Sequence, residues 1–144
     1  MPNDCGEILL VEDSANDVEL TLRALKKHNL ANLVQILTDG AQALEYIFAD
    51  NSSGEGRKPR LIILDLKLPK VSGLEVLQRI KSDERTKTIP VIILTSSQEE
   101  RDLIDSYRYG ANSYVVKPVN FDKFVDAVAQ LGLYWLVVNK VPGQ

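Results

Sequence analysis

The chain has 144 residues, a length typical of one domain with a core of its own. It is 44% hydrophobic and 26% charged with a formal net charge of −3, so it lacks the basic excess expected of a nucleic-acid-binding protein. A single cysteine excludes an internal disulfide, and no apolar stretch approaches the ~20 residues of a membrane span, so we expect a cytoplasmic protein.

Four continuous apolar runs predict parallel strands that are buried on both faces. They are residues 8–11, 61–64, 91–94 and 114–116, and the polar residues after them are Glu12 and Asp13, Asp65, Thr95, and Lys117. A fifth and less apolar run, residues 34–38, predicts a strand at an edge of the sheet.

A helical pattern follows each predicted strand, which favours an α/β fold with a doubly wound parallel sheet of five strands and five helices. The predicted helices cover residues 14–29 and 41–49, a segment after the turn at 69–73, residues 98–109 before Gly110, and a last helix from about Asn120. We expect one domain over 1–144, with a core at about 6–132 and a C-terminal helical extension at about 133–141.

The polar residues after the strands are the candidate functional residues, because ligands of open α/β sheets bind at the carboxyl ends of the strands. Two carboxylates ~4 Å apart repel by roughly 4 kcal/mol at an effective dielectric constant of ~20. Glu12, Asp13 and Asp65 would therefore favour a bound cation, and Mg²⁺ prefers such oxygen ligands. A single acid there could equally be a solvated helix cap or loop charge, but three acids favour the metal site.

Asp65 is also a candidate nucleophile, because carboxylates form aspartyl phosphates. Lys117 would supply a cation for a phosphoryl oxygen, and Thr95 would donate a hydrogen bond to another. Taken singly, Lys117 is an ordinary surface lysine and Thr95 an ordinary strand end. Their joint position argues for phosphoryl chemistry.

Four separated motifs resemble the signature of receiver domains of two-component response regulators, the CheY-like proteins. The motifs are Glu12-Asp13, Asp65-Leu66-Lys67-Leu68-Pro69 with Gly73, Thr95-Ser96, and Lys117-Pro118. The resemblance covers residues 6–132 and implies a flavodoxin-like sheet with strand order 2-1-3-4-5.

The resemblance also implies a role for each residue. Asp65 would accept a phosphoryl group from the phosphohistidine of a sensor histidine kinase. Asp13, Asp65 and the main-chain carbonyl of Lys67 would bind Mg²⁺ directly, and Glu12 would act mostly through water. Lys117 would pair with the phosphoryl group, and Thr95 with Tyr114 would form the switch.

The last helix and its extension carry more apolar residues than one inward-facing stripe can use. We expect a homodimer through this region, the alternative being that the tail folds back on its own domain. The tail resembles that of single-domain regulators that accompany bacterial phytochrome kinases, so the kinase could be a phytochrome. The expected output and dimer surface includes Tyr107, Tyr109, Phe121, Trp135 and Leu136.

Two other functions remain as alternatives to a phosphorylated switch that catalyses only its own phosphorylation and dephosphorylation. A receiver-like interaction module that is not phosphorylated would be expected to lack an acid, the threonine or the lysine, and this chain has all of them. A Mg²⁺-dependent phosphotransfer enzyme would need a second acid two residues after Asp65, where Lys67 stands.

Overall fold

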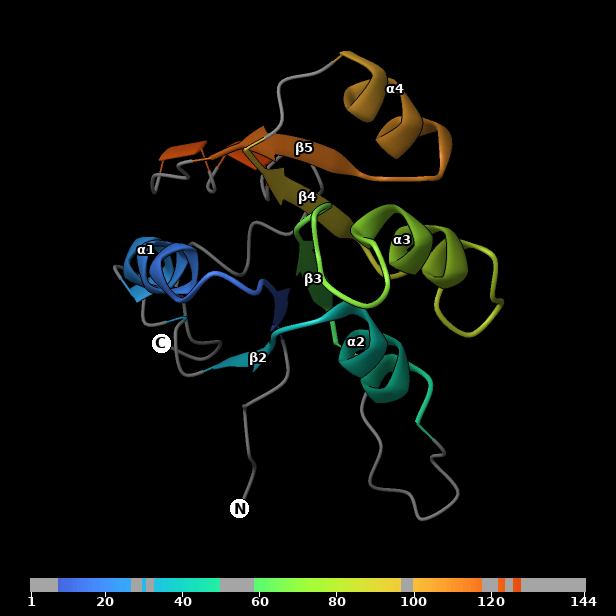
Figure 1. The fold of residues 1–144 in the computed structure, drawn as a ribbon, viewed down its shortest axis with the longest axis horizontal. Helices are drawn as coiled ribbons and strands as arrows, with labels where there is room; N and C mark the ends of the chain where they lie inside the picture. The colour runs from blue at the N-terminus through green and yellow to red at the C-terminus, as the bar shows by residue number, and fades with distance from the viewer. Residues whose placement is uncertain are drawn as a thin grey trace, which may run out of the picture.

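The structure, a computed structural model, describes residues 8–26, 30, 33–49, 59–96, 100–117, 122–123 and 126–127. Five parallel strands form one sheet in the order β2-β1-β3-β4-β5, which confirms the expected fold (Figure 1). The strands are β1 (Ile8–Val11), β2 (Val34–Leu37), β3 (Leu61–Leu64), β4 (Val91–Thr95) and β5 (Ser113–Val116). The helices within the described ranges include α1 (Ala15–Lys26), α2 (Gly40–Ile47), α3 (Gly73–Lys81) and α4 (Glu100–Arg108).

The burial of the strands follows their place in the sheet. All residues of β1, β3 and β4 are buried, whereas β2 and β5 at the two edges each have three half-buried residues. Because side chains alternate between the faces of a strand, the central strands supply two separate core clusters. Leu25 of α1 packs into one cluster, and Ile47 of α2 and Leu77 of α3 pack into the other. Figure 1 accordingly shows α1 on one side of the sheet and α2 and α3 on the other.

Within the described residues, the helix boundaries lie within one or two residues of those predicted, and α2 ends at Ile47 rather than at Ala49. Gly110 follows α4 with a positive φ of 103°, which confirms its predicted role after the helix end. Of the predicted last helix, residues 122–123 and 126–127 are described and are helical. The extension at 133–141 lies outside the described residues. Among the helices that are described, none has the length and apolarity needed to cross a membrane.

Lys81 is the last residue of α3. It contacts the end of the sheet where β4 and β5 begin, opposite to the carboxyl ends of the strands. Its ammonium group donates to the carbonyl oxygens of Lys87 and Ile89, at 3.1 and 2.6 Å, and to Oδ1 of Asn112 at 3.0 Å. Asn112 Oδ1 in turn accepts from the main-chain nitrogen of Val91 at 2.9 Å. Burial lowers the pKa of Lys81. The contact holds α3 against the starts of β4 and β5.

Gly73 allows the start of α3 to approach the end of β3. A Cβ atom on Gly73 would collide with the carbonyl oxygen of Asp65 and with Cα of Leu66. The main-chain nitrogen of Gly73 donates to the carbonyl oxygen of Leu66 at 2.8 Å, so this close approach is part of the loop after β3. The position of Asp65 therefore depends on a glycine eight residues later.

We predict that Gly73→Ala lowers the free energy of unfolding by about 1–3 kcal/mol, because the added methyl group overpacks main chain that cannot move aside freely. Urea unfolding measures the effect. Gln78→Ala, on the exposed side of the same helix and away from its N-cap, is the control and should change stability by less than about 0.5 kcal/mol. Equal stability of the two variants would contradict the packing argument.

Candidate functional site

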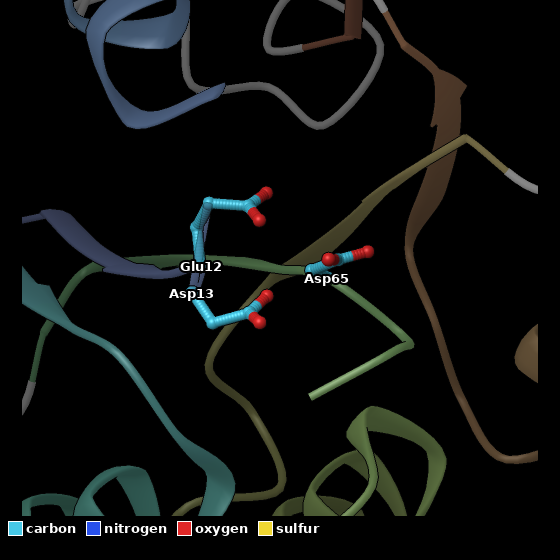
Figure 2. Close-up of side chains that lie close together, drawn as sticks. All are labelled: Glu12, Asp13 and Asp65. Atoms are coloured by element: carbon cyan, nitrogen blue, oxygen red, sulfur yellow. The ribbon is translucent and has the colours of Figure 1, made fainter. Parts of the chain in front are cut away.

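Glu12, Asp13 and Asp65 gather at the carboxyl ends of β1 and β3. One carboxylate oxygen from each lies within 4.8 Å of the others. Figure 2 shows the three side chains extending to the same side of the two strands. Glu12 and Asp65 are only 1% and 5% exposed, whereas Asp13 is exposed. The predicted cluster therefore forms, with Asp13 on its solvent side.

The sheet positions this cluster through main-chain hydrogen bonds that continue beyond the strands. The main-chain nitrogen of Glu12 donates to Leu37 at the end of β2 at 2.9 Å, and that of Asp65 donates to Val11 at 3.1 Å. Oε2 of Glu12 accepts from the main-chain nitrogen of Ser14 at 3.2 Å, where α1 begins. Two acids are thus held on the rigid part of the fold.

The three acids fit a hard divalent cation. Oxygens bound to one Mg²⁺ at about 2.1 Å lie at most about 4.2 Å apart, so a spacing within 4.8 Å needs only small shifts or one bridging water. Lys67, whose carbonyl oxygen was expected to be a ligand, lies in the loop after β3 with an exposed side chain. The ligand role of its carbonyl oxygen stays a prediction.

Lys117 contacts three carboxylates at once. Its Nζ lies 2.6 Å from Glu12 Oε1, 2.8 Å from Asp17 Oδ2 and 3.3 Å from Asp65 Oδ2. The side chain is 11% exposed, and it follows β5 directly. The main-chain nitrogen of Lys117 donates to the carbonyl oxygen of Thr95 at 2.8 Å, so the ends of β4 and β5 set its position. The predicted meeting of Lys117 with Asp65 is confirmed.

The charges of Glu12 and Lys117 are linked. Burial raises the pKa of Glu12, and the nearby carboxylate of Asp65 adds to this, while the contact with Lys117 opposes it. Burial alone would lower the pKa of Lys117, but its contacts with Asp17 and Glu12 outweigh burial and raise the pKa. Lys117 is therefore a permanent cation in a group of acids that it does not fully neutralise.

Thr95 and Tyr114 lie on the same face of the sheet. Thr95 is the last residue of β4 and is fully buried. Tyr114 pairs with Ile93, two residues before Thr95, and packs against the core cluster that contains Ile93. Side chains two residues apart on a strand lie on the same face of the sheet. Thr95 therefore lies on the face of Ile93 and Tyr114.

The expected surface residues are only partly described. Tyr107 is 50% exposed on α4, near the exposed Leu103 and Ile104. Tyr109, in contrast, packs against the core cluster on the α3 side of the sheet. Phe121, Trp135 and Leu136 lie outside the described residues.

The loop after β3 is tied to the start of α2. Lys70 has a positive φ of 69°, and Val71 donates to Pro69 across it at 2.8 Å. The carbonyl oxygen of Pro69 also accepts from the nitrogen of Gly40 at 3.2 Å. A lysine at positive φ is uncommon, so this turn is held by its surroundings next to the site.

Asp17, the third acid that contacts Lys117, is not among the site residues predicted from the sequence. Its pattern resembles an ordinary helix start, in which an acid stands three residues after a capping serine. A signal was nevertheless present, because the first turn of α1 follows directly from Glu12 and Asp13 and places one more acid near the same edge of the sheet.

Most of the chain matches one known protein family. Residues 8–129 match the family described as the response regulator receiver domain. The match includes all the strands and all the residues of the cluster around Lys117.

Individual relatives agree with the family match. The chain is similar to the bacteriophytochrome response regulator RtBRR, with 52% sequence identity and a TM-score of 0.79 over 94% of this chain and 83% of that chain. It is similar to the bacteriophytochrome response regulator AtBRR, with 47% identity and a TM-score of 0.80 over 95% of this chain and 96% of that chain. Response regulator Rcp1 of Synechocystis sp. is 38% identical over 94% of this chain and 92% of Rcp1. A crystal structure of the Mn²⁺-bound form of Rcp1 has a TM-score of 0.74 and covers 94% of this chain and 98% of that chain.

We predict that Mg²⁺ raises the melting temperature, because a ligand that binds only the folded state stabilises it, by about 2.7 kcal/mol at a hundred times its dissociation constant. Asp13→Asn should abolish this rise and, in EDTA, should be at least as stable as the wild type, because one repelling carboxylate is gone. Thermal unfolding with and without MgCl₂ measures both effects.

Glu45→Gln is the control for Asp13→Asn, because Glu45 is an exposed acid on α2 outside the cluster. It should keep the full response to Mg²⁺. A response of Asp13→Asn as large as that of the wild type would show that the metal binds elsewhere.

Proposed function

The chain belongs to the family of response regulator receiver domains, and on this premise we propose that Asp65 accepts a phosphoryl group from the phosphohistidine of a sensor histidine kinase. One observation carries the proposal: the buried carboxylate of Asp65 lies 3.3 Å from Lys117 and beside two further acids suited to a metal ion. A nucleophile, a cation and a metal-binding group are the parts that phosphoryl transfer to a carboxylate requires.

The transfer forms one bond and breaks one bond. An oxygen of Asp65 bonds to phosphorus as the bond between phosphorus and the histidine nitrogen breaks, and that nitrogen keeps the electron pair. Lys117 is positioned to contact an oxygen of the transferred group, since it already contacts Asp65. Bound Mg²⁺, held by Asp13, Asp65 and the carbonyl oxygen of Lys67 with Glu12 acting through water, would supply charge screening. Support for a divalent ion comes from the relative Rcp1, which has a Mn²⁺-bound form.

The readout is proposed to pass through Thr95 and Tyr114. Thr95 would donate a hydrogen bond to the phosphoryl group and shift toward it, and Tyr114 on the same face would repack into the space that becomes available. Their shared face and the pairing of Tyr114 with Ile93 support this coupling. The phosphoryl group thereby biases a two-state element by binding one state better than the other.

The proposed phosphodonor is a phytochrome histidine kinase. The support is the similarity to RtBRR and AtBRR, which are bacteriophytochrome response regulators. The chain itself is proposed to catalyse only its own phosphorylation and dephosphorylation, in the cytoplasm.

We predict that incubation with acetyl phosphate and Mg²⁺ adds one phosphoryl group, because Asp65 can attack a small phosphodonor as it would a phosphohistidine. Mass spectrometry of the intact protein measures the addition. Asp65→Asn should remain unmodified, whereas Asp83→Asn, in the loop after α3 and away from the cluster, should be modified like the wild type. A wild-type chain that stays unmodified would favour the alternative of a receiver-like module that is not phosphorylated.

We further predict a homodimer through the last helix and its extension, with Phe121, Trp135 and Leu136 in the interface. Its support is the number of apolar side chains in this region, which exceeds what one helix face can bury. Light scattering should give twice the monomer mass, and replacing both Trp135 and Leu136 with serine should return the monomer mass. A monomer mass at every protein concentration, with and without acetyl phosphate, would contradict the dimer.

A further inference from the structure

We propose that Asp17 is a positioning residue that holds Lys117 and competes with the phosphoryl group for it, and so weakens the hold of the site on that group. The proposal rests on the proposed function of Asp65. Asp17 Oδ2 lies 2.8 Å from Lys117 Nζ, closer than Asp65 Oδ2 at 3.3 Å. Asp17 is on α1 and Lys117 follows β5, so the contact joins two elements on either side of the strand ends.

The local structure of α1 leaves the carboxylate of Asp17 available for this contact. Ser14 caps the helix by accepting from the main-chain nitrogen of Asp17 at 3.2 Å. In a capping box the acid at this position would reach back to the main-chain nitrogen of the serine. Here Glu12 Oε2 takes that place at 3.2 Å. The side chain of Asp17 is therefore not needed for capping, and it turns to Lys117 instead.

The ammonium group is held by two hydrogen bonds and one further ion-pair contact. Lys117 donates to Asp17 Oδ2 at 2.8 Å and to Asp65 Oδ2 at 3.3 Å, and its Nζ also lies 2.6 Å from Glu12 Oε1, which has no hydrogen-bond partner. A phosphoryl group on Asp65 has three oxygens and takes over the donor that Asp65 used. A second contact from Lys117 to the phosphoryl group requires Nζ to move, and this movement lengthens its contact with Glu12 or with Asp17.

The difference in burial between Glu12 and Asp17 decides which acid loses its contact with Lys117. The Glu12 side chain is 1% exposed, so a carboxylate left there without its cation would be costly. The Asp17 side chain is 30% exposed and can be hydrated when Lys117 leaves it. Asp17 is thus the releasable partner, and its negative charge opposes both the departure of Lys117 and the arrival of a phosphoryl dianion.

The test is Asp17→Asn, which keeps the shape of the side chain and one acceptor oxygen but removes the charge. In the presence of Mg²⁺, we expect the variant to bind beryllofluoride, a mimic of the phosphoryl group, roughly fivefold tighter than the wild type, the size expected of a partly exposed ion pair. Isothermal titration calorimetry measures the affinity. The lifetime of the phosphorylated protein made with acetyl phosphate should lengthen in the same direction.

Glu19→Gln is the matched control. Glu19 is an exposed acid of the same helix that pairs with Arg23 at 3.1 Å, so the variant makes the same change of net charge without touching Lys117. It should bind the mimic as the wild type does. An affinity of Asp17→Asn that equals that of Glu19→Gln, or lies below that of the wild type, overturns the proposal.

A second measurement separates this proposal from the proposed function. In protein labelled with ¹⁵N-lysine and free of metal and phosphate, the Lys117 ammonium signal should shift in Asp17→Asn and stay in place in Glu19→Gln. An unchanged signal in Asp17→Asn shows that the contact is not made and overturns the positioning role. A shifted signal in a protein that takes up neither phosphoryl group nor mimic would instead refute the function of Asp65.

Discussion

The ammonium group of Lys117 is the point on which the rest of the site depends. It lies among carboxylates from the end of β1, the first turn of α1 and the end of β3, while its main chain is tied to the end of β4. Without this cation, buried Glu12 and Asp65 would face each other as like charges in a poorly hydrated place. One side chain thereby connects the stability of the unphosphorylated state to the group that the site is proposed to bind.

The sheet keeps these charges close together because it leaves the acids little freedom to move apart. Three fully buried strands end side by side, and the hydrogen-bond ladder continues through Glu12 and Asp65. The close approach of Gly73 to Asp65 and the turn at Lys70 restrain the loop that follows. Preorganised charges need no rearrangement when a cation or a phosphoryl group arrives.

The site has more acids than cations, and this excess favours the binding of a cation over the binding of an anion. Among the described residues, Glu12, Asp17 and Asp65 contact Lys117, and Asp13 lies beside Glu12 and Asp65. An incoming divalent cation is therefore favoured, and an incoming dianion is disfavoured until that cation is present. Within this balance the acids differ by exposure. Buried Glu12 is bound to its position, exposed Asp13 is available to a metal, and half-buried Asp17 can exchange its cation for water.

The sequence by itself determined the layers, the strand order through family resemblance, and which polar residues gather at the strand ends, because buried parallel strands have continuous apolar runs and their polar ends must share one edge. It did not show that Lys117 would contact Asp17, because the two residues are 100 positions apart and each looks ordinary in its own segment. It also did not show that Lys81 would donate to three oxygens, one of which belongs to Asn112, 31 positions away. Local patterns determine which elements form and which faces they bury. Only the packed structure decides which charged side chains meet, because their partners come from parts of the chain that local periodicity does not relate.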